Sequence, residues 1–193
     1  MRFFIAVLGL TLSFAASTGL SAQQNYLANN TILIVRHAEK SPESGTGLTP
    51  QGENRAQLYT TYFRPFHDGG LNLTIDSLYA GADSKKSFRP RLTLEPLSKA
   101  TGIPLHHEIG TTDPQALVND LKTHPHGPHP LIAWRHSEIP NLIAAFGGSP
   151  SLLPESRWPD ETYDWVVVLT TGPSAEVTSA RLIREDLKVP LKR

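Results

Sequence analysis

The sequence contains no cysteine among its 193 residues, and this absence removes several kinds of chemistry at once. Disulfide bonds, thiolate zinc sites and thiol nucleophiles all require cysteine side chains. The stability of the folded chain therefore has to come from its packed core. A chain of this length is long enough to bury a sizeable core within one compact domain.

An excess of either charge sign is also missing, since 18 Lys and Arg residues balance 18 Asp and Glu residues. A nucleic-acid-binding domain usually carries a basic surface, so we expect no nucleic acid partner. The sequence has no internal repeat and no low-complexity stretch. What remains is a composition with 39% hydrophobic residues and 16 prolines, which is typical of a globular protein with well-defined loops.

A long apolar stretch occurs only near the start of the sequence. Arg2 is followed by a mostly apolar run over residues 3–16, and small residues then lead to Ala22. These features are typical of a secretory signal peptide. The alternative is an uncleaved membrane anchor, but the run is short against the roughly 20 residues that a membrane-spanning helix needs. We predict a signal peptide over residues 1–22 and a mature domain over residues 23–193, exported to the periplasm or secreted, with no stable membrane insertion after signal removal.

Short β-rich runs alternate with helix-start signals along the mature chain. The predicted strands cover residues 31–35, 77–80, 131–134, 163–170 and 177–183. The predicted helices begin at Thr49-Pro50, Arg89-Pro90, Asp113-Pro114 and Ser137, where Thr49 and Ser137 are expected to cap their helices. This alternation predicts an α/β protein built as a three-layer α/β/α sandwich around a mostly parallel central sheet.

Two of the predicted strands are followed by the same dipeptide. Arg36-His37 ends the first strand and Arg135-His136 ends the third. In such sheets ligands bind at the carboxyl ends of the strands, so both pairs are expected at one edge of the molecule. Arg89 precedes Pro90 and is expected at a helix N-terminus. Guanidinium groups and helix N-termini both favour phosphate oxygens, and the sequence therefore indicates a pocket for a dianion.

Four segments, in this order, resemble motifs of the histidine phosphatase superfamily, which includes phosphoglycerate mutases and acid phosphatases. Residues 35–40 resemble its Arg-His-Gly/Ala motif, and residues 47–56 resemble the segment that follows this motif. Residues 89–93 resemble its Arg-x-x-x-Thr helix start, and residues 134–140 resemble its second-histidine motif. The resemblance extends from about residue 31 to residue 169 and implies the phosphoglycerate mutase-like fold.

The resemblance also implies an activity, that of a phosphomonoester hydrolase acting on a small phosphorylated substrate. His37 would attack phosphorus and become phosphohistidine, while Arg36, Arg89 and His136 would hold the phosphoryl oxygens. Neither a metal nor another cofactor is required, because arginines and the second imidazole supply positive charge. We expect a backbone carbonyl to hold the other ring nitrogen of His37.

The leaving oxygen needs a proton, which calls for a carboxylic acid near the pocket. The mutase branch of the family places a glutamate after the second-arginine helix, and Glu108 is the best counterpart in this sequence. Glu138 is the second candidate. Substrate contacts are also expected from Lys40, Ser137, Arg135 and Glu138, where Arg135 replaces the glycine that commonly precedes the second histidine.

Three other hypotheses about the function remain open at this point. The first is a phosphate-binding protein on the same fold with little catalysis. The second is a metal-dependent hydrolase that uses His124, His126 and His129, although a plain proline-rich loop explains these residues as well. The third is a mutase, against which the predicted export argues.

Overall fold

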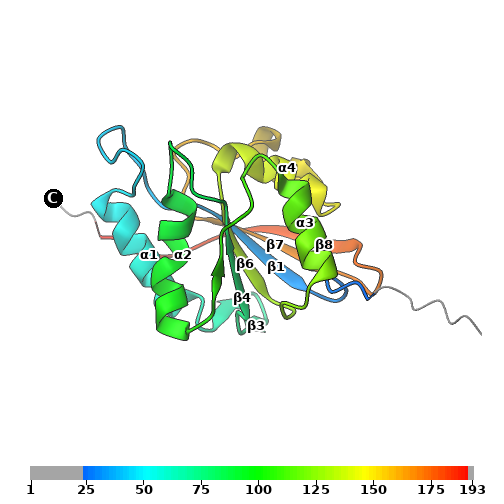
Figure 1. The fold of residues 1–193 in the computed structure, drawn as a ribbon. Helices are drawn as coiled ribbons and strands as arrows, with labels where there is room; N and C mark the ends of the chain where they lie inside the picture. Colours follow the sequence, from blue (N-terminus) through cyan, green and yellow to red (C-terminus); the bar gives the residue numbers. More distant parts are fainter. Residues whose placement is uncertain (1–23, 191–193) are drawn as a thin grey trace, which may run out of the picture.

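A six-stranded sheet forms the centre of the protein. The computed structural model describes residues 24–190, so the predicted signal peptide lies outside the described residues. The strand order is β5-β4-β6-β1-β7-β8, and Figure 1 shows this sheet at the centre of the molecule with helices on either side. The parallel strands are β1 (Thr31–Arg36), β4 (Ser77–Ala80), β5 (Leu105–His106) and β6 (Pro130–Trp134), and the antiparallel ones are β7 (Trp165–Thr171) and β8 (Val177–Arg184).

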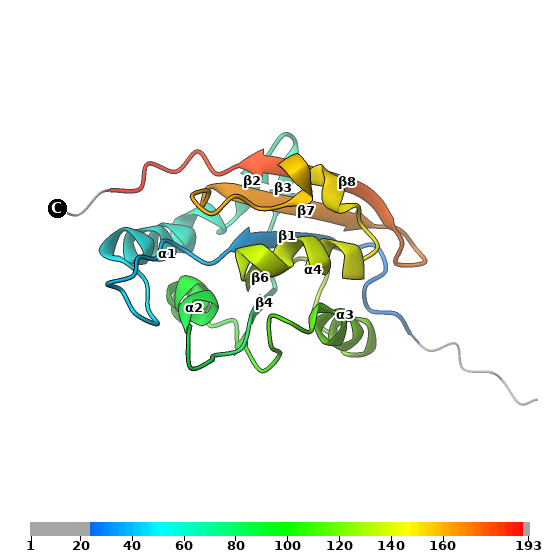
Figure 2. The same ribbon diagram turned by 90° about the horizontal axis from the view of Figure 1, so that it is seen from above.

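Helices cover both faces of this sheet. Helices α1 (Pro50–Tyr62) and α2 (Arg89–Thr101) lie on one face, and α3 (Pro114–Thr123) and α4 (Ile139–Ala145) lie on the other (Figure 2). Leu33 and Val35 pack in the core under α1 and α2, whereas Ile32 and Ile34 pack in the core under α3 and α4. This alternation along a strand buried on both faces is the expected geometry of a parallel sheet, and the predicted three-layer α/β/α sandwich is confirmed.

Capping residues define one end of each of three helices. Thr49 caps α1 by accepting a hydrogen bond from Gly52 N at 3.1 Å, and Asp113 caps α3 by accepting one from Ala116 N at 3.0 Å. Gly102 ends α2 with a φ of 76°, a left-handed conformation that glycine adopts without strain.

The predicted start of the fourth helix is wrong. A 3-10 turn over His136–Glu138 comes first, and α4 begins at Ile139. The backbone N–H groups of Glu138 and Ile139 both bond to Arg135 O, at 2.9 and 3.1 Å. The backbone of Arg135 therefore satisfies the donors that the Ser137 side chain was expected to cap, and Ser137 itself is exposed.

Sequence reasoning missed three short strands, β5 and the hairpin formed by β2 (Phe66–Asp68) and β3 (Leu71–Leu73). Two or three residues are too few to show an alternating pattern. None of the helices within residues 24–190 has the length and apolarity needed to cross a membrane.

Candidate active site

The two Arg-His pairs meet at one edge of the sheet. β1 and β6 pair in parallel, with Arg36 opposite Trp134, and His37 N donates to Trp134 O at 2.9 Å immediately beyond the last pair. The rings of His37 and His136 stand edge to face, with centroids 6.2 Å apart and planes at 80°. The expected juxtaposition of the two imidazoles is thus present.

The His37 side chain is oriented by its own backbone. Its Nδ1 lies 2.8 Å from Ala38 O; because a carbonyl only accepts, Nδ1 must carry the proton and Nε2 the lone pair. The expected carbonyl partner is therefore confirmed. Burial, aided by the nearby charges of Arg36 and Arg89, lowers the pKa of His37 to about 3, even though the Ala38 carbonyl opposes the shift. His37 is thus a neutral imidazole with one free nitrogen at neutral pH.

Both neighbouring helices hold the short loop that follows His37. Ala38 N donates to the hydroxyl of Thr93 in α2 at 2.8 Å, and this hydroxyl donates to Arg89 O at 2.8 Å. On the other side, Thr49 N, at the start of α1, donates to Glu39 O at 2.9 Å. The backbone around His37 is therefore fixed by contacts that lie far apart in the sequence.

Arg89 is the first residue of α2 and enters the site as predicted. Its Nε donates to Gly47 O at 2.8 Å, and its Nη2 donates to Gly45 O. Two carbonyl groups of the loop before α1 therefore orient the guanidinium. Donors remain on both terminal nitrogens, because a guanidinium has five N–H groups.

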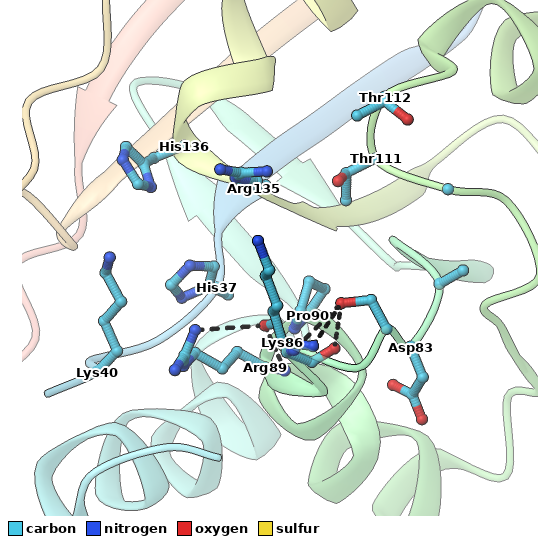
Figure 3. Close-up of a pocket in the computed structure, with 14 residues that line it drawn as sticks. His37, Lys40, Asp83, Lys86, Arg89, Pro90, Thr111, Thr112, Arg135 and His136 are labelled. Carbon is cyan, nitrogen blue, oxygen red and sulfur yellow. Dashed lines mark hydrogen bonds between the residues drawn. The ribbon is translucent and has the colours of Figure 1, made fainter. Parts of the chain in front are cut away.

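A pocket of about 350 Å³ joins these residues (Figure 3). His37, His136, Arg89, Lys40 and Arg135 all line it, so the structure brings five of the nine predicted site residues together. Its other lining residues are Ala82, Asp83, Ser84, Lys86, Ser87, Pro90, Gly110, Thr111 and Thr112.

His136 contacts an acidic residue through its Nε2 atom. Its Nε2 lies 2.7 Å from Asp160 Oδ1. Burial is the largest influence on its pKa and, with the charge of Arg36, lowers the pKa to about 4, while Asp160 acts in the other direction. His136 is therefore also neutral at neutral pH when the pocket holds no added anion.

Arg36 is buried and does not line the pocket. The residue is fully buried, and its Nη1 donates to the carbonyl groups of Pro159 (3.2 Å), Thr162 (3.0 Å) and Asp160. The ring of Tyr163 covers the guanidinium at 3.8 Å. Nε and Nη2 of Arg36 have no hydrogen-bond partner within residues 24–190. The predicted direct contact of Arg36 with the pocket is therefore not observed.

The two predicted proton donors both lie outside the pocket. Glu108 lines a separate cavity with Tyr79 and His106. His106 stacks on Tyr79, and Glu108, two residues further along an extended segment, lies on the same side as His106. Glu138 accepts a hydrogen bond from the Asn141 side chain at 2.8 Å. Glu108, Glu138 and Ser137 are therefore not among the residues that line the pocket with His37.

Sequence reasoning missed two kinds of residue at the site. Lys86, Thr111 and Thr112 line the pocket from loops that show no regular pattern. Asp160 reaches His136 from an irregular segment before β7. The sequence signal that could have identified Lys86 as a site residue is its position three residues before Arg89. Nothing in the sequence points to Asp160.

The histidine-rich loop before β6 does not gather its side chains. His124 Nδ1 pairs with Asp120 at 3.0 Å, His126 Nε2 donates to Leu121 O at 2.8 Å, and His129 Nδ1 lies 3.5 Å from Asp76. Within residues 24–190, no group of three or more His, Asp or Glu side chains is placed to hold a metal ion.

The fold has known counterparts, although no protein family model and no curated protein matches this chain. One similar solved structure is the protein histidine phosphatase SixA complexed with tungstate. It has 16% identity and a TM-score of 0.50, and the match covers 80% of this chain and 97% of that chain. Another is phosphoglycerate mutase from Plasmodium falciparum, with 15% identity, a TM-score of 0.53 and coverage of 86% and 97%. The chain has the phosphoglycerate mutase-like fold, as the sequence resemblance implied.

Proposed function

We propose that this protein is a phosphomonoester hydrolase that works through a phosphohistidine intermediate on His37, without a metal ion. The observation that carries the proposal is the free Nε2 of a neutral, buried His37 in a pocket shared with His136, Arg89 and Lys40. A nucleophile must offer an unprotonated nitrogen, and a phosphate dianion needs nearby positive charge.

In the first step, the lone pair on His37 Nε2 attacks phosphorus. The P–N bond forms while the ester P–O bond breaks, and the electron pair of that bond stays on the leaving oxygen. The imidazole ring becomes more positive, and the Nδ1–H group bonded to Ala38 O stabilises this charge. Arg89 and Lys40 offset the charge on the phosphoryl oxygens, as in other phosphoryl-transfer sites.

The leaving oxygen takes a proton, and we assign its delivery to Asp160. The carboxylate of Asp160 contacts His136 and is 78% exposed, so solvent water can bring a proton to it for transfer to the leaving oxygen. Asp83 lines the opposite part of the pocket but pairs with Arg91 Nε at 2.8 Å. Asp160 is therefore the carboxylate next to the imidazole pair that forms no ion pair with a Lys or Arg side chain within residues 24–190. Water then hydrolyses the P–N bond and releases inorganic phosphate.

The test is hydrolysis of 4-nitrophenyl phosphate in the presence of a chelator. Wild type is expected to release phosphate, and His37→Ala is expected to lower kcat by about 1000-fold or more, as for other covalent nucleophiles. His67→Ala, at an exposed histidine outside the pocket, serves as the matched control.

The other readings give different results in the same assay. Equal and slow release by wild type and His37→Ala, together with tight binding of inorganic phosphate, would indicate a phosphate-binding protein. Loss of wild-type activity in the chelator, restored by zinc, would indicate a metal-dependent hydrolase.

A further inference from the structure

The pocket continues beyond the two histidines into a second basic region. Lys86, from the loop between β4 and α2, extends toward Arg135 across the pocket, and Thr111 and Thr112 lie beside them (Figure 3). Lys40 lies on the other side of His37 (Figure 3). The positive charge of the pocket is therefore divided between two places.

The two cations of this second region lack partners. Neither the Lys86 ammonium nor the Arg135 guanidinium has an ion pair or a side-chain hydrogen bond within residues 24–190, although backbone atoms of both residues are bonded. The acidic lining residue Asp83 does not neutralise them, because Arg91 holds its carboxylate at 2.8 Å. Two exposed cationic side chains that line one pocket without a counter-charge favour the binding of an anion there.

A charge count shows that one phosphate group does not need all of these cations. Lys40 and Arg89 lie at the histidine end and together match the two negative charges of a phosphate monoester. Lys86 and Arg135 remain, and they are placed for a second anionic group on the same molecule.

The other lining residues of the pocket indicate the chemical character of the rest of the bound molecule. Ser84, Ser87, Thr111 and Thr112 supply hydroxyl groups, while Ala82 and Pro90 are the apolar side chains of the lining. A cavity of about 350 Å³ is at the small end of the range for ligand pockets. The lining thus suits a compact, polar molecule better than a large apolar one.

We propose that the substrate is a small phosphate monoester that carries a second anionic group, a carboxylate or another phosphate, and that Lys86 and Arg135 bind this group. The proposal rests on the proposed hydrolase function, because it assigns the phosphate to the His37 end of the pocket.

The experiment compares three esters that share a three-carbon chain and differ in the far group, which is anionic, neutral or cationic. These are 3-(phosphonooxy)propanoate, 3-hydroxypropyl phosphate and 3-aminopropyl phosphate. For wild type, kcat/KM is expected to fall by about tenfold from the anionic to the neutral ester, and further for the cationic ester, since a good charge contact is worth about one factor of ten.

Two variants test whether Lys86 and Arg135 cause the preference for the anionic ester. Lys86→Met and Arg135→Met are each expected to bring the ratio of kcat/KM between the anionic and the neutral ester close to one. Lys85→Met, at the exposed neighbouring lysine that does not line the pocket, is expected to keep the wild-type ratio. A wild-type ratio near one would overturn the proposal, as would a ratio that both pocket variants leave intact.

A binding measurement separates this proposal from the hydrolase function. Titration calorimetry with His37→Ala measures the affinities of the same three esters without turnover. If wild type hydrolyses none of them but the anionic ester still binds about tenfold more tightly than the neutral one, the function is wrong and the second-anion site stands. If wild type hydrolyses the neutral ester and the affinities are equal, the hydrolase function stands and the second-anion site is wrong.

Discussion

At the residue scale, the protonation states of the two imidazoles define the chemistry of the site. Burial lowers the pKa of His37 to about 3 and that of His136 to about 4. Because both values lie below the usual range, deprotonation of His37 does not limit the rate above about pH 4. A loss of activity as the pH rises through the neutral range would therefore not come from either imidazole.

The assignment of Asp160 as proton donor predicts a dependence on the leaving group. Asp160→Asn is expected to lower kcat about 100-fold for an alkyl phosphate, whose alkoxide needs a proton. The same variant is expected to change kcat only a few-fold for 4-nitrophenyl phosphate, because nitrophenolate leaves without one. Steady-state kinetics on the two esters measures this difference.

Two controls accompany this comparison. Glu108→Gln is expected to behave like wild type, since Glu108 lines a different cavity. Equal losses on both esters in Asp160→Asn would show that Asp160 only orients His136, and the assignment of the donor would have to be withdrawn.

At the element scale, the close approach of α1 to the loop after β1 positions the nucleophile. A Cβ atom at Gly52 would lie 2.6 Å from Glu39 O and 2.9 Å from Glu39 N, both backbone atoms that have little room to move. The Arg55 side chain, also in α1, clamps the Glu39 carboxylate through Nε at 3.0 and 3.1 Å and Nη2 at 2.9 Å. The first turns of α1 thus fix the loop two residues beyond His37.

Gly52→Ala is therefore expected to move this loop. Overpacking against backbone is predicted to lower the free energy of unfolding by ~1–3 kcal/mol, and the displaced nucleophile to lower kcat about 10- to 100-fold. Denaturant unfolding and hydrolysis of 4-nitrophenyl phosphate measure the two effects. Gln57→Ala, at an exposed position of the same helix, is the control. Wild-type kcat in a folded Gly52→Ala protein would show that the close contact does not position His37.

Arg55 of α1 also connects the loop after β1 to Glu185, which follows β8. Arg55 Nη1 also pairs with the fully buried carboxylate of Glu185, which accepts a hydrogen bond from the Tyr59 hydroxyl. Burial raises the pKa of Glu185 to about 7. The sequence does not predict this pairing, because Arg55 and Glu185 are 130 residues apart and each resembles an ordinary surface residue.

At the scale of the whole molecule, the fold follows from patterns that are local in the sequence. The buried runs at β1, β6 and β7 and the capped starts of α1 and α3 are visible without coordinates, and they suffice to predict the layered sheet. The edge at which His37 and His136 meet follows from the parallel pairing of β1 and β6.

The parts of the site that were not predicted come from irregular segments. Asp160, Lys86 and the buried position of Arg36 depend on how loops fold over the edge of the sheet, and no periodic pattern specifies such loops. Glu108 was assigned from its order along the chain, but the alternation of an extended segment places it on the other side.

The most direct test of the central claim is to identify the phosphorylated atom. Wild type is mixed with 4-nitrophenyl phosphate, quenched in alkali within milliseconds, digested and analysed by mass spectrometry and ³¹P NMR. We predict a single phosphohistidine at His37, with phosphorus on Nε2, because Ala38 O holds Nδ1. Phosphate on His136, on Nδ1 of His37 or on any other residue would contradict the account, as would steady turnover with no phosphorylated protein at any time.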